Sequence, residues 1–214
     1  MAAAFLAGAR FLNFIVNPEA YDKTLQLFSL RFAGFSLYGG VLGALIAFII
    51  WTRAAGRDPW PLLDALVLPS AAAFVLARVG CYLNGCCSGK ATQSFLGVVF
   101  PVKESQEKFF ALLSLAGKKS VAVYPTQLFE LSLAVIILIP VMWFYMRKKL
   151  YPGVAFLLYG ILFTAMRWAI LPLRALPYEA SVTQIGFPLL YVTLIAAGGF
   201  LLLRRIMNKY YIKK

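Results

Sequence analysis

The chain has 214 residues, of which 62% are hydrophobic, and its mean hydropathy is +0.79. Soluble domains are only about 45–50% apolar, so this composition predicts an integral membrane protein. The formal net charge is +13, but the cations gather at the ends of apolar stretches, which is typical of membrane topology and argues against nucleic-acid binding. The chain has no histidine, which excludes histidine-based acid–base chemistry and histidine metal ligands.

The first apolar stretch, residues 2–16, is interrupted by Arg10 and is shorter than the roughly 20 residues that a membrane-spanning helix needs. It predicts either an interfacial helix or the end of a partial span whose beginning is absent. It lacks the basic region of a cleavable signal peptide. Residues 17–31 are mixed and polar, and we expect them to form an exposed connection.

Five further stretches are apolar and long enough to cross a membrane. We therefore expect an all-α polytopic membrane protein, with a single transmembrane domain over residues 1–214. The second span carries Asp64 near its start, and Pro69 favours a kink in it. Between the second and third spans, the polar residues 88–123 predict a small cap outside the membrane. The predicted spans cover residues 35–51, 59–77, 127–146, 154–171 and 184–203.

The cations of the short loops predict the orientation of these spans. Arg53, Arg57, the basic residues 147–149 and the basic C-terminal tail fall on one side if the spans alternate. This side is predicted to be the cytoplasm. Residues 78–90, the cap and residues 124–130 then converge on the outer leaflet, so the active face is expected to be extracytoplasmic.

Residues 78–90, RVGCYLNGCCSGK, form the most distinctive stretch of the chain. Arg78 is the first cation after the second span, and a cation at a membrane boundary is costly unless it meets an anion, carbonyl groups or water. The glycines of this stretch allow sharp turns and let a ligand approach main-chain N–H groups. The stretch therefore predicts an anion or phosphate cradle beside thiols. Its glycines are Gly80, Gly85 and Gly89.

The same stretch holds the three cysteines of the chain, Cys81, Cys86 and Cys87. A zinc site needs four ligands, or three and a water, and cysteines this close in sequence do not favour it, so no metal is predicted. A disulfide between Cys81 and Cys86 suits an oxidising outer face and leaves Cys87 unpaired. A reactive thiolate is a third interpretation, because Arg78 and Lys90 would depress the pKa of a nearby thiol. In the fourth interpretation, the cysteines are unreactive side chains that only fill space in the packing.

Residues 124–130, YPTQLFE, place Thr126 and Glu130 four apart and so on one face of a helix, with Gln127 near that face. Pro125 suits the first helical position. Two interpretations of Glu130 stay open. Either the carboxylate is favoured by the helix dipole alone, or it is directed at Arg78 or at the hydroxyl groups of a ligand.

Taken in order, these stretches resemble the motifs of the prolipoprotein diacylglyceryl transferase family. The similarity covers most of the chain, and residues 36–43, 78–90 and 124–130 are specific as an ordered set. The matches are residues 8–10 with Gly-Gly-Arg, 36–43 with S-F-H-G-G-L-I-G, 78–90 with R-x-G-N-F-x-N-G-E and a Gly-Arg pair, 124–130 with H-P-S/T-Q-L-Y-E, 158–160 with a Tyr-Gly pair, and 181–188 with S-M-G-Q-I-L-S-I-P.

The chain departs from the family pattern at several positions. Where the family has an arginine after the Tyr-Gly pair, this chain has Phe163, although Arg167 lies one turn further on. The chain also begins inside what would be the second of the family's usual seven spans. The other departures are Tyr38 and Tyr124 in place of histidines, Cys81 in place of an asparagine, and Cys86 in place of a glutamate.

The resemblance implies an enzyme of the bacterial inner membrane. It would move a diacylglyceryl group from phosphatidylglycerol, or another anionic phospholipid, to a thiol such as the lipobox cysteine of a prolipoprotein. No cofactor and no nucleic-acid partner are expected. Arginine binds phosphate through two N–H groups, so Arg78 and Arg10 are predicted to hold the headgroup. Without histidine, the base that takes the acceptor proton is predicted to be Glu130, Tyr38 or a cysteine thiolate.

A route through a covalent intermediate on Cys86 or Cys87 remains an alternative. The candidate residues form two sets. The candidate catalytic residues are Arg78, Glu130, Tyr38, Cys86 and Cys87, and the candidate substrate-binding residues are Arg10, Gly39, Gly40, Asn84, Gly85, Gly89, Gln127, Tyr159 and Arg167.

Two other classes of function remain open because a fold does not by itself determine activity. One is a membrane thiol-redox or metal-handling protein that uses Cys81, Cys86 and Cys87. The other is a non-catalytic lipid-binding subunit, which the absence of histidine favours.

Overall fold

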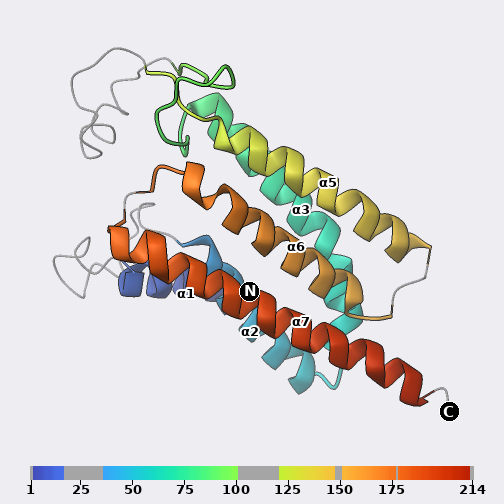
Figure 1. Cartoon of the computed structure of the whole chain (residues 1–214). Coiled ribbons are helices and arrows are strands. Elements are labelled where there is room, and N and C mark those ends of the chain that lie inside the picture. Colours follow the sequence, from blue (N-terminus) through green and yellow to red (C-terminus); the bar gives the residue numbers. More distant parts are fainter. Residues whose placement is uncertain (1, 17–35, 101–120, 148–150, 177, 213–214) are drawn as a thin grey trace. The chain divides into compact units, whose positions relative to one another are not determined.

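The computed structural model describes residues 2–16, 36–100, 121–147, 151–176 and 178–212 (Figure 1). Within these residues the regular elements are helices, and the extended segments pair only through isolated β-bridges. Five helices are long and apolar enough to cross a membrane, which confirms the predicted all-α class. The predicted connection over residues 17–31 and residues 101–120 of the predicted cap lie outside the described residues. The chain forms two units, residues 1–62 and 63–214, and each is described by itself.

The first unit contains helices α1 (Ala2–Val16) and α2 (Leu37–Ala54), which pack against each other through glycines. A Cβ atom at Gly39 would collide with the carbonyl oxygen of Gly8, and one at Gly43 would collide with that of Ala4. Glycines four residues apart let two membrane helices approach to backbone contact. The close approach that these glycines permit is therefore one between helices α1 and α2.

The second unit contains α3 (Pro59–Asn84) from residue 63 onward, together with α5 (Thr126–Met146), α6 (Val154–Ile170) and α7 (Phe187–Ile212). Helix α6 contacts both α5 and α7 (Figure 1). The 3₁₀ turn η3 (Leu171–Leu173) follows α6, and the π-helical turn η4 (Val182–Gly186) precedes α7.

Helix α3 is longer than the sequence predicts. It continues for seven residues past the expected end at residue 77, so Arg78 and Cys81 are helical and do not lie in a loop. The prediction was wrong because a cation was taken as the end of the span. In the structure this cation is neutralised by an ion pair, so the helix can continue through it.

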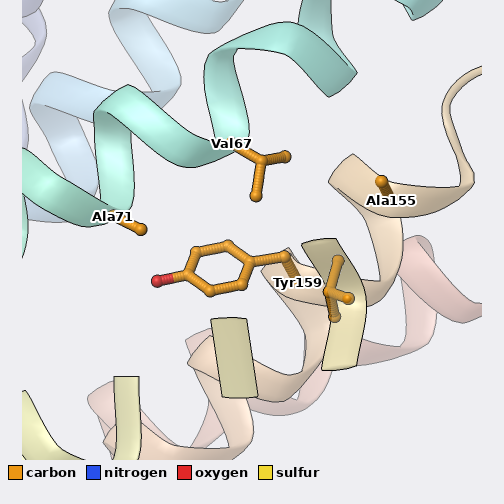
Figure 2. Packing of buried hydrophobic residues seen from close by; sticks show 5 residues of the cluster. Val67, Ala71, Ala155 and Tyr159 are labelled. Atoms are coloured by element: carbon orange, nitrogen blue, oxygen red, sulfur yellow. The ribbon is translucent and has the colours of Figure 1, made fainter. Parts of the chain in front are cut away.

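The hydrophobic core of the second unit lies between α3, α5 and α6. Figure 2 shows the ring of Tyr159 on α6 extending toward Val67 and Ala71 of α3, with Ala155 one turn earlier on α6. Val141 of α5 completes this cluster. The small and branched side chains around the Tyr159 ring let the three helices pack closely, as is usual in protein interiors. This packing joins the three helices whose ends carry the polar residues described below.

Asp64 explains how a charged residue is accommodated inside the second span. Its side chain is 2% exposed, and its carboxylate accepts hydrogen bonds from the backbone N–H groups of Gly153 at 2.7 Å and Phe156 at 2.8 Å. The first N–H groups of a helix have no partner within the helix. A carboxylate from α3 therefore caps the N-terminus of α6, where the helix dipole also favours negative charge.

Candidate functional site

Glu130 is the centre of a buried cluster of charged side chains. Its Oε2 atom lies 2.7 Å from Nε of Arg78, and its Oε1 atom lies 2.6 Å from Nη1 of Arg167 and 2.8 Å from Nη1 of Arg174. The glutamate side chain is 1% exposed and the three arginine side chains are 8–12% exposed. Of the two interpretations of Glu130, the structure therefore supports the one in which the carboxylate is directed at Arg78.

The helix ends of the second unit bring these four residues together. Glu130 lies in the first two turns of α5, whereas Arg78 lies near the C-terminal end of α3 and Arg167 in the last turn of α6. Each charge has the sign that the nearby helix terminus favours. Arg174 follows immediately after the turn η3.

An aromatic pair supports Arg78 from the apolar side. Its guanidinium carbon lies 5.0 Å from the ring centroid of Phe74, one turn earlier on α3. Phe74 in turn packs edge-to-face on Phe163 of α6 at 4.8 Å. A cation over an aromatic face is stabilised by the ring quadrupole. Phe163, which stands where the resemblance led us to expect an arginine, is thus part of the packing behind Arg78.

The cluster carries more positive than negative charge. Three guanidinium groups and one carboxylate sum to a formal charge of +2. The pKa of Arg174 is lowered by burial and further by the neighbouring Arg167 and Arg78, while Glu130 opposes this shift. Buried charges are stable only when paired, so this arrangement favours the binding of an additional anion.

A glycine-based cap ends α3 and folds the chain back on itself. Gly85 has a φ of 69°, its N–H group donates to the carbonyl of Tyr82 at 3.1 Å, and the N–H group of Cys86 donates to the carbonyl of Cys81 at 3.0 Å. This pair of bonds around a left-handed glycine is the Schellman motif. It places Cys86 directly beside Cys81, although five positions separate them in the sequence.

The three cysteines converge as a result. Their Sγ atoms all lie within 4.8 Å of one another, and all three are free thiols, so the disulfide between Cys81 and Cys86, one of the alternatives left open by the sequence, is not formed in this structure. Although Cys87 as a whole is exposed, desolvation raises the pKa of its thiol, and Cys86 raises it further, while Arg78 lowers it. The net upward direction argues against Cys87 as a ready thiolate in the free protein.

Helix α5 holds the loop that carries these cysteines. The side-chain amide of Gln127 donates to the carbonyl of Cys86 at 2.8 Å, and the hydroxyl of Thr126 donates to the carbonyl of Cys87 at 3.2 Å. Gln127 and Thr126 are each 1% exposed. The polar residues at the start of α5 therefore serve the loop as well as the charged cluster.

The amides of Gly85 and Gly89, which were predicted to belong to a main-chain anion cradle, already donate to backbone carbonyls. The N–H group of Gly85 is used by Tyr82, and that of Gly89 donates to the carbonyl of Tyr124 at 2.8 Å. A Cβ atom at Gly89 would crowd the carbonyl of Leu173 and the side chain of Thr126. Gly89 is needed for close packing of the loop, and Gly80 lies inside α3.

The remaining predicted residues occupy three places. Tyr159 is in the hydrophobic core, 9% exposed, and Asn84 is the exposed last residue of α3. A Cβ atom at Gly40 would meet the ring of Phe5 on α1, so this position is used for helix packing, as Gly39 is. The candidates of the first unit, described separately from the cluster, are Arg10, Tyr38, Gly39 and Gly40.

Two residues of the site were not among the sequence candidates. Arg174 lies between the predicted spans 154–171 and 184–203, and Tyr191 lies within the second of them. In the structure Arg174 forms an ion pair with Glu130. Tyr191 of α7 is 2% exposed and forms a hydrogen bond with Arg167. The one sequence signal for Arg174 was its position directly after an apolar span, which it shares with Arg78.

The described fold and site define a polytopic helical membrane protein with a buried, cation-rich cluster beside three thiols. The chain belongs to the prolipoprotein diacylglyceryl transferase family, whose model matches residues 1–204. This confirms the family predicted from the ordered motifs.

Curated relatives of the chain carry the name phosphatidylglycerol–prolipoprotein diacylglyceryl transferase. They include proteins of Francisella tularensis subsp. holarctica, subsp. mediasiatica and subsp. novicida, each 30% identical to this chain over 166 residues. The matched region covers 75% of this chain and 56% of each relative. The chain thus matches a little more than half the length of these relatives.

Proposed function

We propose that the chain is a membrane-embedded transferase that moves a diacylglyceryl group from phosphatidylglycerol, or a related anionic phospholipid, to the thiol of a prolipoprotein. The observation that carries this proposal is the buried cluster of Arg78, Arg167 and Arg174 around Glu130, with its formal charge of +2. Family membership and the names of the relatives support the same chemistry.

The cluster suits the phosphate of a lipid headgroup. Guanidinium groups bind phosphate through paired N–H donors, and they also stabilise the negative charge that develops on a departing glycerol phosphate. Both oxygens of Glu130 are occupied by arginines at 2.6–2.8 Å. We therefore assign to Glu130 the role of orienting the arginines, in place of the role of a general base.

The family and the distribution of cations also indicate the membrane and the orientation of the protein in it. We propose that the protein lies in the bacterial inner membrane, with the cluster and the cysteine loop toward the extracytoplasmic side and the C-terminus in the cytoplasm. The exposed Arg147 follows the end of α5 that is opposite Glu130, and it supports this orientation because cytoplasmic loops carry an excess of cations.

The test is a transfer assay with the full chain in liposomes that contain phosphatidylglycerol and a lipobox peptide. Mass spectrometry of the peptide detects the added diacylglyceryl group. We expect Arg78→Ala to lower the rate by about 100-fold or more, as the loss of one stabilising donor does in other sites, and Arg78→Lys to recover part of it.

The matched control for this assay is Arg147→Ala. Arg147 is an exposed arginine that stacks over Trp143 at 5.4 Å, at the other end of α5 from the cluster, so its loss should leave the rate unchanged. A folded Arg78→Ala variant with full activity would contradict the proposal, as would a wild-type protein that binds phosphatidylglycerol and never yields product.

The three converging free thiols favour a thiol-redox protein as a second candidate. Such a protein would cycle between free thiols and a disulfide in a redox buffer. It would lose that cycle on Cys81→Ser or Cys86→Ser and keep it on Arg78→Ala. The transferase predicts the opposite dependence on Arg78.

A further inference from the structure

The cysteine cluster has the composition and spacing of a metal site. Thiolates prefer zinc and other soft metal ions, and a Zn–S bond of about 2.3 Å places two tetrahedral sulfur ligands about 3.8 Å apart. The three Sγ atoms, all within 4.8 Å of one another, need only small side-chain rotations to reach that spacing. Closeness in sequence, which counted against a metal site, does not prevent this convergence, because the Schellman motif folds Cys86 back onto Cys81.

The backbone around the cluster is constrained in a way that simple packing does not require. Cys87 has a φ of 62°, and within the described part of the chain it is the one non-glycine residue with positive φ. A side chain in this conformation costs about 1–2 kcal/mol. Strain of this kind persists where the surrounding structure enforces it, and here the hydrogen bonds from Gln127 and Thr126 hold the two cysteine carbonyls.

The charges nearby are also complementary to a metal–thiolate group. A divalent ion with three thiolates carries a formal charge of −1. Arg78 interacts electrostatically with Cys87, and it belongs to the cluster with a formal charge of +2. A lipid phosphate and a three-thiolate zinc centre would together balance that charge.

We propose that Cys81, Cys86 and Cys87 bind one zinc ion as three thiolates and leave its fourth coordination position open. An open position is what distinguishes catalytic from structural zinc sites. This site would activate the acceptor thiol without a histidine. That role rests on the proposed transferase function, whereas the metal binding itself does not.

In the transfer step, the acceptor thiol binds at the fourth position and releases its proton to solvent, because a metal-bound thiol is deprotonated. Its sulfur then attacks the terminal glyceryl carbon of the lipid and forms a C–S bond. The bond from that carbon to the phosphate oxygen breaks, and its electron pair leaves on the glycerol phosphate beside the arginines. No redox change and no further reactant are needed.

Metal binding is tested directly on the purified full chain after removal of bound metal. Elemental analysis should find one zinc per chain after reloading, and Co²⁺ should produce a sulfur-to-cobalt charge-transfer band. The chain has three cysteines, so this band cannot arise elsewhere. Zinc should also protect the three thiols of the unaltered protein from alkylation, a readout that needs no variant.

Single Cys→Ser changes should weaken metal binding and the triple change should abolish it, while Ser88→Ala, in the same loop, should retain it. A wild-type protein without a charge-transfer band or thiol protection would overturn the proposal. Retention of stoichiometric zinc by the triple variant would overturn it as well.

The transfer assay separates the two proposals. Metal-free protein that transfers the lipid at the full rate would overturn the catalytic role of zinc and leave the transferase standing. Zinc-loaded protein that fails to transfer would contradict the transferase and leave the metal site standing. We expect metal removal to lower the rate at least about 100-fold and zinc to restore it, with Arg78→Ala inactive while it still binds zinc.

Discussion

Replacing Glu130 by glutamine should destabilise the protein strongly. The substitution keeps the size of the side chain and removes its charge. It leaves Arg78, Arg167 and Arg174 without the carboxylate that each contacts at 2.6–2.8 Å, and the formal charge of the cluster rises from +2 to +3. The amide oxygen of glutamine can still accept a hydrogen bond, so little hydrogen bonding is lost. The loss of stability therefore comes from the arginine charges that no carboxylate compensates.

The magnitude follows from the burial of these groups. Two unit charges about 4 Å apart interact by about 4 kcal/mol at an effective dielectric constant of about 20. Three such attractions are lost here, while the repulsion among the three arginines remains. Removing one partner of a buried ion pair costs about 3–5 kcal/mol in measured cases. We expect Glu130→Gln to fall at the upper end of this range.

The assay is equilibrium unfolding in mixed micelles, followed by tryptophan fluorescence and circular dichroism. Glu179→Gln is the matched control, because Glu179 is exposed and its change should stay within about 0.5 kcal/mol. Adding Arg174→Gln to Glu130→Gln should recover about 0.5–3 kcal/mol, since one unpaired cation is removed. A Glu130→Gln protein as stable as the control would refute the ion-pair argument.

Three further substitutions test the supporting structure. Asp64→Ala removes the cap of α6 and should cost about 1–3 kcal/mol in the same unfolding assay, with Asp64→Asn closer to wild type; equal effects would argue against the cap. Gly39→Ala should lower the thermal midpoint by overpacking α1 against α2, at about 1–3 kcal/mol, whereas Gly199→Ala, with open space around it, should not. Gln127→Leu should release the loop at Cys86 and speed its exchange with deuterium, as mass spectrometry of the fragments would show; unchanged exchange would contradict that role.

Much of the fold could be predicted from local sequence. The five spans follow from the lengths of apolar stretches, because a helix must satisfy its own backbone to cross a membrane. The start of α5 was predicted within one residue of its position at Thr126. The end of α3 was missed, because whether Arg78 ends a helix depends on a partner 52 positions away, Glu130.

The candidate site shows the same division between local and distant information. Residue type and position within a span were enough to single out Arg78, Glu130 and Arg167 as costly charges that need partners. The sequence pattern carried no sign that Arg174 shares the same carboxylate, since this depends on how the turn η3 returns the chain to α5.

The sequence alone determined the class of protein, its helices and its family, because hydropathy and ordered motifs are properties of contiguous residues. Only the tertiary structure decided which groups are available for chemistry. It committed the amides of Gly85 and Gly89 to backbone carbonyls and brought three thiols to within 4.8 Å. The physical reason is that hydrogen-bond partners and the neighbours of a charge come from residues distant in the chain, and packing of the helices selects them.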